Sequence, residues 1–347
     1  MSGKLILKNG REFSGRSFGA NRSISGEMVF ATGMVGYPES LTDPSFYGQI
    51  LILTYPIIGN YGVPNRKYFE SKGIQISGLI VSNYIDTPSH FQSKQTLSSW
   101  LTSENIPGLE ISDTRQITQH LRNNGSTLGK IILKKNVDWY DPDKENVIDK
   151  VSTKKVYTQG NGTLHFLLID CGLKRNIVNS LVRRNIKVTV VPWNHNPFNQ
   201  NFEYDGIVVS NGPGDPKMAK ETIETVRSAM KSKIPILGVC LGNQILALAA
   251  GGNTKKLKFG HRSQNQPCIM MPSGRCFITT QNHGFAVSKI PAGFKEWFVN
   301  ANDGTNEGII HSKYPFMSTQ FHPEATPGPQ ECDFIFDDFI MRVKSGK

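Results

Sequence analysis

The stretch that decides the fold is PILGVCLGNQ, residues 235–244, in which one cysteine stands between two glycines after an apolar run and before a helix-like run. Gly238, Cys240 and Gly242 form the pattern G-x-C-x-G, the spacing of a nucleophile elbow with cysteine in place of serine. In such an elbow a strand turns tightly into a helix and holds the nucleophile at the carboxyl edge of a sheet. The alternative is a cysteine that only packs against its neighbours, because free cysteine is among the most buried residue types.

The sequence around this stretch alternates between short apolar runs and helix-like runs. This alternation predicts a parallel sheet covered by helices on both faces. The predicted strands are residues 165–170, 187–193, 204–210 and 234–240, and the predicted helices are 174–185, 220–232 and 243–251. In such sheets ligands bind outside the carboxyl ends of the strands. Three glycine-rich segments follow predicted strands at that edge: DCGLKRN, SNGPGDP and VCLGNQ.

The first half of the chain is rich in predicted strands. Residues 4–8 and 11–13 flank Asn9-Gly10, a strong signal for a hairpin with a two-residue turn. Further strands are predicted at 49–56 and 73–81, and helices at 95–101 and 114–125. A polar, charged stretch then separates the two halves. We therefore predict a strand-rich α/β domain over 1–134, a linker over 135–162, and an α/β domain with an open, mostly parallel sheet over 163–347.

Composition narrows the class of protein. The chain has 347 residues, 38% of them hydrophobic and 19% charged, as expected for a globular protein of two domains. Its formal charge of +11 is scattered and no aromatic-basic RNA motif is present. We therefore expect first a solvated basic surface and, as the second choice, a docking surface for an acidic partner protein. We do not expect this chain to bind nucleic acid.

No apolar run approaches the roughly 18 residues of a membrane span, and no targeting segment is visible. The five cysteines are odd in number and lack CxxC spacing, so we expect a reducing compartment and no metal site.

A thiolate that attacks an amide needs a base and a group that orients the base. His322 follows an apolar run in FHPEATPGP, and Glu324 stands two residues later, where it could accept a hydrogen bond from the imidazole as in a triad. A surface histidine in a proline-rich turn is the alternative. SNGPGDP predicts a rigid loop whose N–H groups point into a site, and QNHGF offers amide side chains, with an ordinary turn as the alternative for both. His261 and His311 have no partner at catalytic or metal spacing in the sequence.

Taken together, GVCLGNQ and FHPEATPGP resemble the class I glutamine amidotransferases, whose triad is cysteine, histidine and glutamate. VSNGPGDP, KKLKFGH, QNHGFAV and ATPGP narrow the resemblance to the small chain of glutamine-dependent carbamoyl phosphate synthase. The first half agrees, because FATGMVGYPESLTDPSFYGQILILTYPIIGNYGV and ISDTRQITQHLR resemble the N-terminal domain of that chain. The resemblance covers nearly the whole sequence. It implies an amidotransferase fold for 163–347 and a partner-docking role for 1–134.

The resemblance also assigns roles to individual residues. It implies that Cys240 is the nucleophile, His322 the base and Glu324 the residue that orients the base. It implies no metal ligands. It further implies that L-glutamine is contacted by Ser45, Gly212, Gly214, Leu241, Gln244, Asn282, Gly284 and Phe285.

The implied reaction releases ammonia from L-glutamine through a cysteine thioester and passes it to a large chain. That large chain makes carbamoyl phosphate from bicarbonate and ATP for arginine and pyrimidine biosynthesis. We expect a heterodimer with the large chain, or higher oligomers of it, with ATP and Mg²⁺ bound there and no cofactor on the present chain. A bacterial cytoplasm or a plastid stroma is the expected compartment.

Two departures from the family pattern stand out. Asn243 occupies a position where many relatives have histidine, and HRSQNQP, residues 261–267, replaces an expected His-Gly-Gly-Asn-His-Pro stretch. We expect both to alter a docking surface rather than the triad. Two alternative functions stay open. One is an amidotransferase subunit for anthranilate or GMP synthesis, which would not need the first half of the chain. The other is a flavodoxin-like scaffold with a buried cysteine, which would not need His322 and Glu324.

Overall fold

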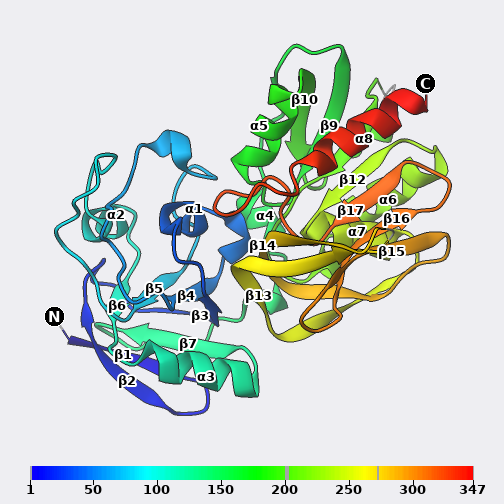
Figure 1. Cartoon of the computed structure of the whole chain (residues 1–347). Helices are drawn as coiled ribbons and strands as arrows, with labels where there is room; N and C mark the ends of the chain where they lie inside the picture. Colours follow the sequence, from blue (N-terminus) through cyan, green and yellow to red (C-terminus); the bar gives the residue numbers. More distant parts are fainter. Residues whose placement is uncertain (1, 200–202, 272, 347) are drawn as a thin grey trace. The chain divides into compact units, whose positions relative to one another are not determined.

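The computed structural model describes residues 2–199, 203–271 and 273–346. The chain divides into two compact units, residues 1–145 and 146–347 (Figure 1). The division falls inside the stretch predicted as a linker, and part of that stretch is structured, as α4 (Ile148–Val151) and β8 (Tyr157–Gln159). Within the described residues no helix combines the length and the apolar character that crossing a membrane requires.

Seven strands of the first unit close into a barrel in the order β1-β2-β6-β5-β4-β3-β7. Strands β3 to β6 pair in parallel with one another, and the other pairs of the barrel are antiparallel. The barrel confirms the predicted strand-rich α/β domain. Its elements are β1 (Ser2–Leu7), β2 (Glu12–Ser17), β3 (Ile24–Ala31), α1 (Tyr37–Leu41), β4 (Gln49–Leu53), β5 (Gly78–Val81), α2 (Leu97–Ser103), β6 (Gly108–Glu110), α3 (Thr114–Asn124) and β7 (Thr127–Ile132).

Strand β4 shows how the barrel is held together. Ile50 and Ile52 pack in one hydrophobic cluster with residues of α3, whereas Leu51 and Leu53 pack in another with residues of α2. All four side chains are buried. Because side chains alternate between the two faces of a strand, one continuous apolar run joins two separate clusters.

The predicted hairpin at Asn9-Gly10 is confirmed, with a longer loop than the sequence suggests. β1 and β2 pair antiparallel, with Leu5 opposite Phe13. The Leu7 N–H donates to the Arg11 carbonyl at 2.9 Å, and Gly10 takes a φ of +86°. This is a three-residue loop in which glycine occupies the left-handed position, rather than the two-residue turn.

The predicted helix at 114–125 is confirmed as α3. Its first turn is capped by Asp113, whose carboxylate accepts a hydrogen bond from the Gln116 N–H at 2.8 Å. The helix ends at Asn124, and its apolar residues Ile117 and Leu121 are buried. The capping residue and the spacing of these two side chains therefore set both the bounds and the buried face.

The second unit contains a ten-stranded sheet in the order β14-β13-β15-β16-β17-β12-β11-β9-β10-β8. The strands β17, β12, β11, β9 and β10 at its centre pair in parallel. This confirms the predicted α/β domain. Its central elements are β9 (Leu164–Asp170), α5 (Arg175–Arg183), β10 (Ile186–Pro192), β11 (Gly206–Val209), α6 (Lys220–Lys231), β12 (Ile236–Val239), α7 (Leu241–Ala249), β17 (Phe316–Thr319) and α8 (Phe334–Ser345).

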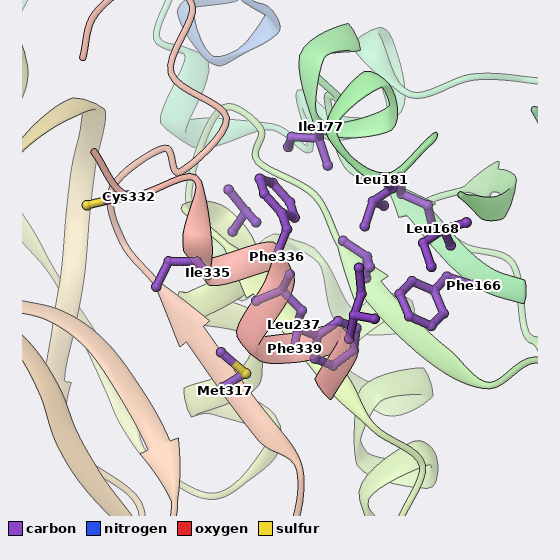
Figure 2. Close-up of a cluster of buried hydrophobic side chains, with 14 of the residues drawn as sticks. Phe166, Leu168, Ile177, Leu181, Leu237, Met317, Cys332, Ile335, Phe336 and Phe339 are labelled. Carbon is purple, nitrogen blue, oxygen red and sulfur yellow. The ribbon is translucent and has the colours of Figure 1, made fainter. Parts of the chain in front are cut away.

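Helices cover both faces of this parallel centre, as predicted. Phe166 and Leu168 of β9 point to one face, where they join a cluster with α5 and α8 (Figure 2). The alternate residues Leu167 and Ile169 join a second cluster with α6 and α7. The apolar runs of the central strands are continuous because both of their faces are buried.

The antiparallel strands of the sheet were not predicted. Beyond β17 the sheet continues through β16 (Asn306–His311), β15 (Phe294–Asn300), β13 (Asn253–Met270) and β14 (Arg275–Lys289), and β8 pairs antiparallel with β10. Most of β13 is polar: it contains lysine, asparagine and glutamine and lacks the alternation of apolar and polar residues that predicts a strand. The β13–β14 ribbon matters for function because β14 carries the QNHGF segment.

Phe336 on α8 offers a test of this packing, because its side chain is fully buried in the cluster shared with β9 (Figure 2). Phe336→Ala should lower the free energy of unfolding by about 3–5 kcal/mol, since it removes a ring and leaves a cavity. The control Met341→Ala alters a side chain of the same helix that is 56% exposed, and should change stability by less than about 0.5 kcal/mol. Urea denaturation of the full chain measures both, and equal effects would contradict the packing.

Candidate active site

The expected elbow is present at the carboxyl edge of the parallel strands, where β12 turns into α7 at Cys240. The cysteine has φ +54° and ψ −99°, a conformation that costs a residue with a side chain about 1–3 kcal/mol. Its N–H donates to the Thr319 carbonyl of β17 at 2.8 Å, which ties the bend to the neighbouring strand. The side chain of Cys240 is buried.

Both glycines of the motif lie where two backbone segments touch. A Cβ atom on Gly238 would stand 2.4 Å from the carbonyl oxygen of Gly242. A Cβ atom on Gly242 would stand 2.2 Å from the carbonyl oxygen of Val209 in β11. Any side chain at either position would push α7 away from the sheet, so close approach requires glycine at both.

His322 and Glu324 follow β17, the strand beside β12. The His322 Nδ1 and the Glu324 Oε1 lie 2.6 Å apart, and both side chains are buried. The other ring nitrogen, Nε2, has no hydrogen-bond partner among the described residues. The Cys240 thiol lies near enough to help raise the pKa of this imidazole. The structure thus brings the three residues of the predicted triad together.

Lys174 adds a buried positive charge that the sequence patterns did not reveal. Its Nζ lies 3.0 Å from the Glu324 Oε1, and the exposed fractions of the two side chains are 2% and 0%. Lys174 follows β9 within DCGLKRN, one of the glycine-rich segments at strand ends. Its place at the carboxyl edge of the sheet was the one signal that could have singled it out.

The charges of this group sustain one another. Burial acts to raise the pKa of Glu324, but the positive charges of Lys174 and His322 outweigh burial and lower it to about 2. Burial acts to lower the pKa of His322, but the Glu324 charge outweighs burial and the opposing charge of Lys174, and raises the pKa to about 10. At neutral pH Glu324 is therefore ionised and His322 is an imidazolium.

Several residues predicted to contact glutamine surround Cys240. Its thiol donates to the Asn282 carbonyl at 3.6 Å. Gly212 follows β11 and is in close contact with Leu241, because a Cβ on Gly212 would lie 2.9 Å from the Leu241 Cδ2. Gly214, two residues further on, has a φ of +82°, a backbone conformation that favours glycine.

Gln244 and the QNHGF segment are joined by hydrogen bonds. The Gln244 Nε2 donates to the Phe285 carbonyl at 2.8 Å and to the Gln320 Oε1 at 3.1 Å. The Gln320 Nε2 in turn donates to the Cys240 sulfur at 3.7 Å. Gly284 leaves room for a neighbouring guanidinium, since a Cβ there would lie 3.2 Å from an Arg262 nitrogen. Gln320 was not predicted, and it links the nucleophile to α7.

Ser45 belongs to the first compact unit. It lies in a turn of 3₁₀ helix, Pro44–Phe46, where its N–H donates to the Asp43 carboxylate at 2.9 Å. Its side chain is buried in that unit. Its contact with glutamine stays a prediction.

The expectation that Asn243 and residues 261–267 alter a docking surface is wrong for the residues that are buried. Asn243 is inaccessible, with its Nδ2 donating to the Gln320 Oε1 at 3.1 Å and its Oδ1 accepting from the Ser318 hydroxyl at 2.8 Å. His261, Arg262 and Ser263 are buried as well. Asn243 supports the residue that contacts the nucleophile instead.

His261 lies in a buried polar cluster, although the sequence offered it no partner. Strand pairing sets it opposite His283, and its Nδ1 lies 3.2 Å from the Glu307 Oε1. Ligand-type atoms of these three residues lie within 4.8 Å of one another. These side chains also contact the Gln281 side chain. We interpret the group as a hydrogen-bonded cluster of charged residues rather than as a metal site. Only the long β13–β14 pairing brings these residues together, which residue spacing cannot reveal.

The fold of the second unit is that of a class I glutamine amidotransferase, and the sequence pattern of the family "Glutamine amidotransferase class-I" matches residues 167–342. A second pattern, "Carbamoyl-phosphate synthase small chain, CPSase domain", matches residues 5–131. The chain belongs to the carbamoyl phosphate synthase small-chain family. Its amidotransferase half makes it the glutamine-hydrolysing type of subunit.

Individual relatives agree with this assignment. The chain is 47% identical over 359 residues to the carbamoyl phosphate synthase arginine-specific small chain of Neurospora crassa, covering 98% of this chain and 79% of that one. It is 46% identical over 362 residues to the protein of the same name in Chaetomium globosum, covering 99% and 78%. It is also 45% identical over 390 residues to the multifunctional protein URA2 of Saccharomyces cerevisiae, and there it spans 99% of this chain but 18% of the relative.

Glu324→Gln tests the electrostatics of the buried group. The substitution should destabilise the protein by about 3–5 kcal/mol, because it leaves Lys174 buried without its counter-charge. Because the folded-state pKa of His322 is raised to about 10, its stabilising contribution is complete below about pH 6.5 and disappears as the pH rises through about 10. The stability difference from the wild type should therefore be largest below about pH 6.5 and smaller near pH 10.

Urea denaturation at a series of pH values measures this difference. Glu221→Gln, at an exposed position on α6, is the control and should show no such trend. A difference between wild type and Glu324→Gln that stays constant from about pH 6 to about pH 10 would contradict the charge coupling.

Proposed function

We propose that this chain hydrolyses L-glutamine at Cys240 and delivers the ammonia to a large chain that makes carbamoyl phosphate. The observation that carries the proposal is the strained Cys240 at a sheet edge, beside an imidazole whose far nitrogen is held by a buried carboxylate. Membership of the small-chain family supports the choice of substrate.

In the first step the Cys240 sulfur attacks the carboxamide carbon of glutamine. The thiol proton has already passed to the His322 Nε2, which gives a thiolate beside an imidazolium; the attack then forms the carbon–sulfur bond, and the carbonyl oxygen becomes an oxyanion. Leu241 opens α7, where backbone N–H groups have no partner within the helix. Its N–H and that of Gly212 stabilise the oxyanion, and each such donor is worth about 10²–10³ in rate.

In the second step His322 gives its proton to the amide nitrogen, the carbon–nitrogen bond breaks, and ammonia leaves a thioester on Cys240. Water then attacks the thioester while His322 takes a proton, and glutamate leaves as the thiol is restored. Glu324 holds the ring so that Nε2 serves the reaction. Lys174 keeps Glu324 ionised throughout.

Substrate binding is proposed for the segments around the nucleophile. Gly214 and the Gly212 N–H hold the carboxamide end together with Leu241 and Gln244. The amino-acid end is held by Asn282, Gly284 and Phe285, with Ser45 as a further contact from the first unit. The hydrogen bond from Gln244 to the Phe285 carbonyl supports a joint role for these two segments.

The partner in this proposal is a carbamoyl phosphate synthase large chain, in a heterodimer or a higher oligomer of it. ATP and Mg²⁺ bind to the large chain, and the product serves arginine or pyrimidine biosynthesis. The relatives named as arginine-specific small chains support the first of these. The five cysteines are all free thiols, which supports a reducing compartment such as a bacterial cytoplasm or a plastid stroma, although the relatives named above are fungal.

Replacement of the nucleophile separates the two half-reactions. Cys240→Ala should lower glutamine hydrolysis by about 10³-fold or more, because no other group can form the thioester. Synthesis of carbamoyl phosphate from added ammonia by the assembled complex should persist. The control Cys276→Ala removes an exposed thiol and should leave both rates unchanged. Glutaminase activity retained in Cys240→Ala would be incompatible with the mechanism.

The large chain should raise the glutaminase rate, because a glutaminase that works alone would waste glutamine. We expect a rise of about tenfold or more in kcat/KM when the large chain is added under turnover conditions. A chain reduced to residues 146–347 should lose that rise if the first unit is the docking module. A reduced chain that still binds the large chain and supports glutamine-driven synthesis would refute this docking role.

A further inference from the structure

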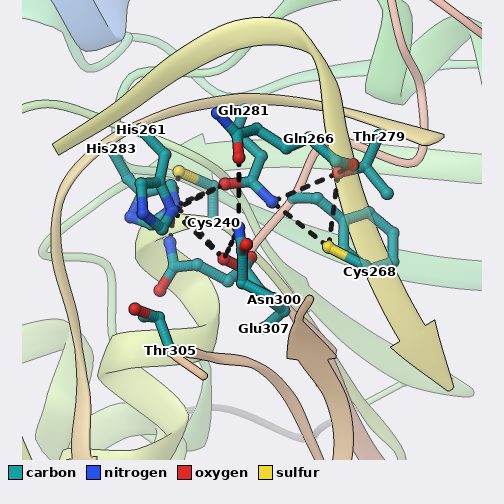
Figure 3. A network of polar contacts seen from close by, with 12 residues as sticks. Cys240, His261, Gln266, Cys268, Thr279, Gln281, His283, Asn300, Thr305 and Glu307 are labelled. Atoms are coloured by element: carbon teal, nitrogen blue, oxygen red, sulfur yellow. Dashed lines mark hydrogen bonds and ion pairs between the residues drawn. The ribbon is translucent and has the colours of Figure 1, made fainter. Parts of the chain in front are cut away.

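A second charged group lies beside the nucleophile, on the antiparallel part of the sheet. Figure 3 shows the side chains of His261, Gln281, His283 and Glu307 meeting at one place. Glu307 comes from β16, His261 from β13, and the other two from β14. None of these side chains has a part in the proposed reaction steps.

The contacts of His261 define its charge. Its Nε2 lies 2.9 Å from the Asp303 Oδ2, and its Nδ1 lies 3.2 Å from the Glu307 Oε1 and 2.9 Å from the Gln281 Oε1. Carboxylate oxygens only accept hydrogen bonds, so both ring nitrogens must carry protons to serve both sides. With both carboxylates ionised, the geometry is that of an imidazolium between two carboxylates.

The electrostatic balance agrees with this geometry. Burial acts to lower the pKa of His261, but Glu307 and Asp303 outweigh burial and raise it. Burial raises the pKa of Glu307, and the hydrogen bond and charge of His261 work against that rise. The carboxylate is completely buried, so without His261 its charge would be very costly.

From His261 the network reaches the segment proposed to hold glutamine. The Gln281 Oε1 that His261 contacts also lies 3.1 Å from the His283 Nε2. The His283 Nδ1 lies 2.8 Å from the Phe285 carbonyl. That same carbonyl accepts a hydrogen bond from Gln244 in the helix after the nucleophile. A neutral His283 has one N–H, which Nδ1 donates to this carbonyl, so the Phe285 peptide is fixed from two sides; on the His283 side the ring packs against His261, with the two ring centroids 5.0 Å apart.

A second connection runs through the backbone. The Glu307 carbonyl accepts a hydrogen bond from the Gln320 N–H at 2.8 Å. The side chain of Gln320 contacts both Cys240 and Gln244. A shift of Glu307 would therefore move groups on both sides of the nucleophile.

We propose that Glu307 and His261 form a positioning pair for residues 281–285, and that the charge of this pair sets how tightly the site binds glutamine. The inference rests on the proposed glutaminase function. It concerns binding rather than the chemical steps, because neither side chain touches the triad. Its signature is a KM for glutamine that depends on the protonation of His261.

The groups that face His261 from each neighbouring element are few. Glu307 faces it from β16, Asp303 from the turn before β16, and His283 from β14, with the two imidazole rings 5.0 Å apart. Arg262 is its neighbour on β13. Burial and the charge of His261 hold the pKa of His283 well below its usual range, so His261 is the imidazole that carries the charge of this group.

The test compares kcat and KM for glutamine between wild type and Glu307→Gln from about pH 6 to about pH 8.5. Without Glu307, His261 loses its proton at a lower pH, because one of its two counter-charges is gone. KM of Glu307→Gln should be raised by about tenfold at the alkaline end and by less than about twofold at pH 6, with kcat little changed. Glu296→Gln is the matched control on the adjacent strand β15, where the Glu296 carboxylate accepts a hydrogen bond from the Asn306 amide at 3.2 Å.

Asp303→Asn is the second variant, since the Asp303 side chain is 45% exposed and its replacement carries less risk for folding. It should show the same trend with a smaller amplitude. The proposal would be overturned if the KM values of both variants equalled those of Glu296→Gln at every pH. It would also be overturned if KM rose by the same factor at every pH, because a purely structural role would produce that result.

Glutamine binding separates this inference from the proposed function. Calorimetric titration of the same substitutions in a Cys240→Ala background should give the same pH-dependent loss of affinity without turnover. A wild-type protein that binds glutamine but does not hydrolyse it would refute the glutaminase function and leave the positioning pair intact. An affinity that is independent of Glu307 at every pH would refute the positioning pair alone.

Discussion

The close approach of β12, α7 and β11 at Gly238 and Gly242 is the constraint on which the rest of the site depends. No side chain fits at either glycine, so the helix can begin directly at the sheet edge. Cys240 is thereby forced into a strained conformation with a positive φ, and the strain is maintained by the packing of a buried sheet on both sides. This arrangement places the Cys240 thiol at the N-terminus of α7 and next to the carboxyl ends of the neighbouring strands.

Buried charge is the second principle of this molecule. Lys174, Glu324 and His322 form one inaccessible group. Buried His261 and Glu307 form another together with the half-exposed Asp303. In each group a cation and a carboxylate tolerate burial only because of the other. The first group prepares the imidazole that faces Cys240. The second lies behind the β14 segment proposed to hold the substrate, so both sides of the nucleophile are supported by charge pairs.

Much of this architecture could be predicted from local sequence. The spacing G-x-C-x-G located the elbow, the helix-like pattern of residues 114–125 located α3, and the alternation of strands and helices indicated the α/β class of residues 163–347. These succeed because strand turns, caps and periodic burial depend on residues close together in the chain. The roles of the residues around Cys240 came from the resemblance to a family, since spacing alone left the alternatives open.

What could not be predicted depends on contacts between distant segments. Lys174 forms an ion pair with Glu324, which lies 150 residues later in the sequence. His261 lies on β13, a strand too polar to be recognised from its sequence pattern, and contacts Glu307 only in the folded sheet. Asn243 was expected at a surface, yet it is buried beside Gln320 because α7 is covered on the side that faces β17. Polar side chains in such places give no periodic signal, and only the folded sheet assigns their partners.

The most direct test of the account is covalent labelling of the full chain with a glutamine analogue that carries an electrophile in place of the carboxamide. Mass spectrometry of the intact protein and its peptides should show one adduct, located on Cys240, with a rate that saturates with the analogue and falls when glutamine competes. Labelling of the exposed Cys276 without saturation, or an unmodified Cys240 under conditions in which glutamine binds, would contradict the central claim that the elbow cysteine is the nucleophile of a glutamine site.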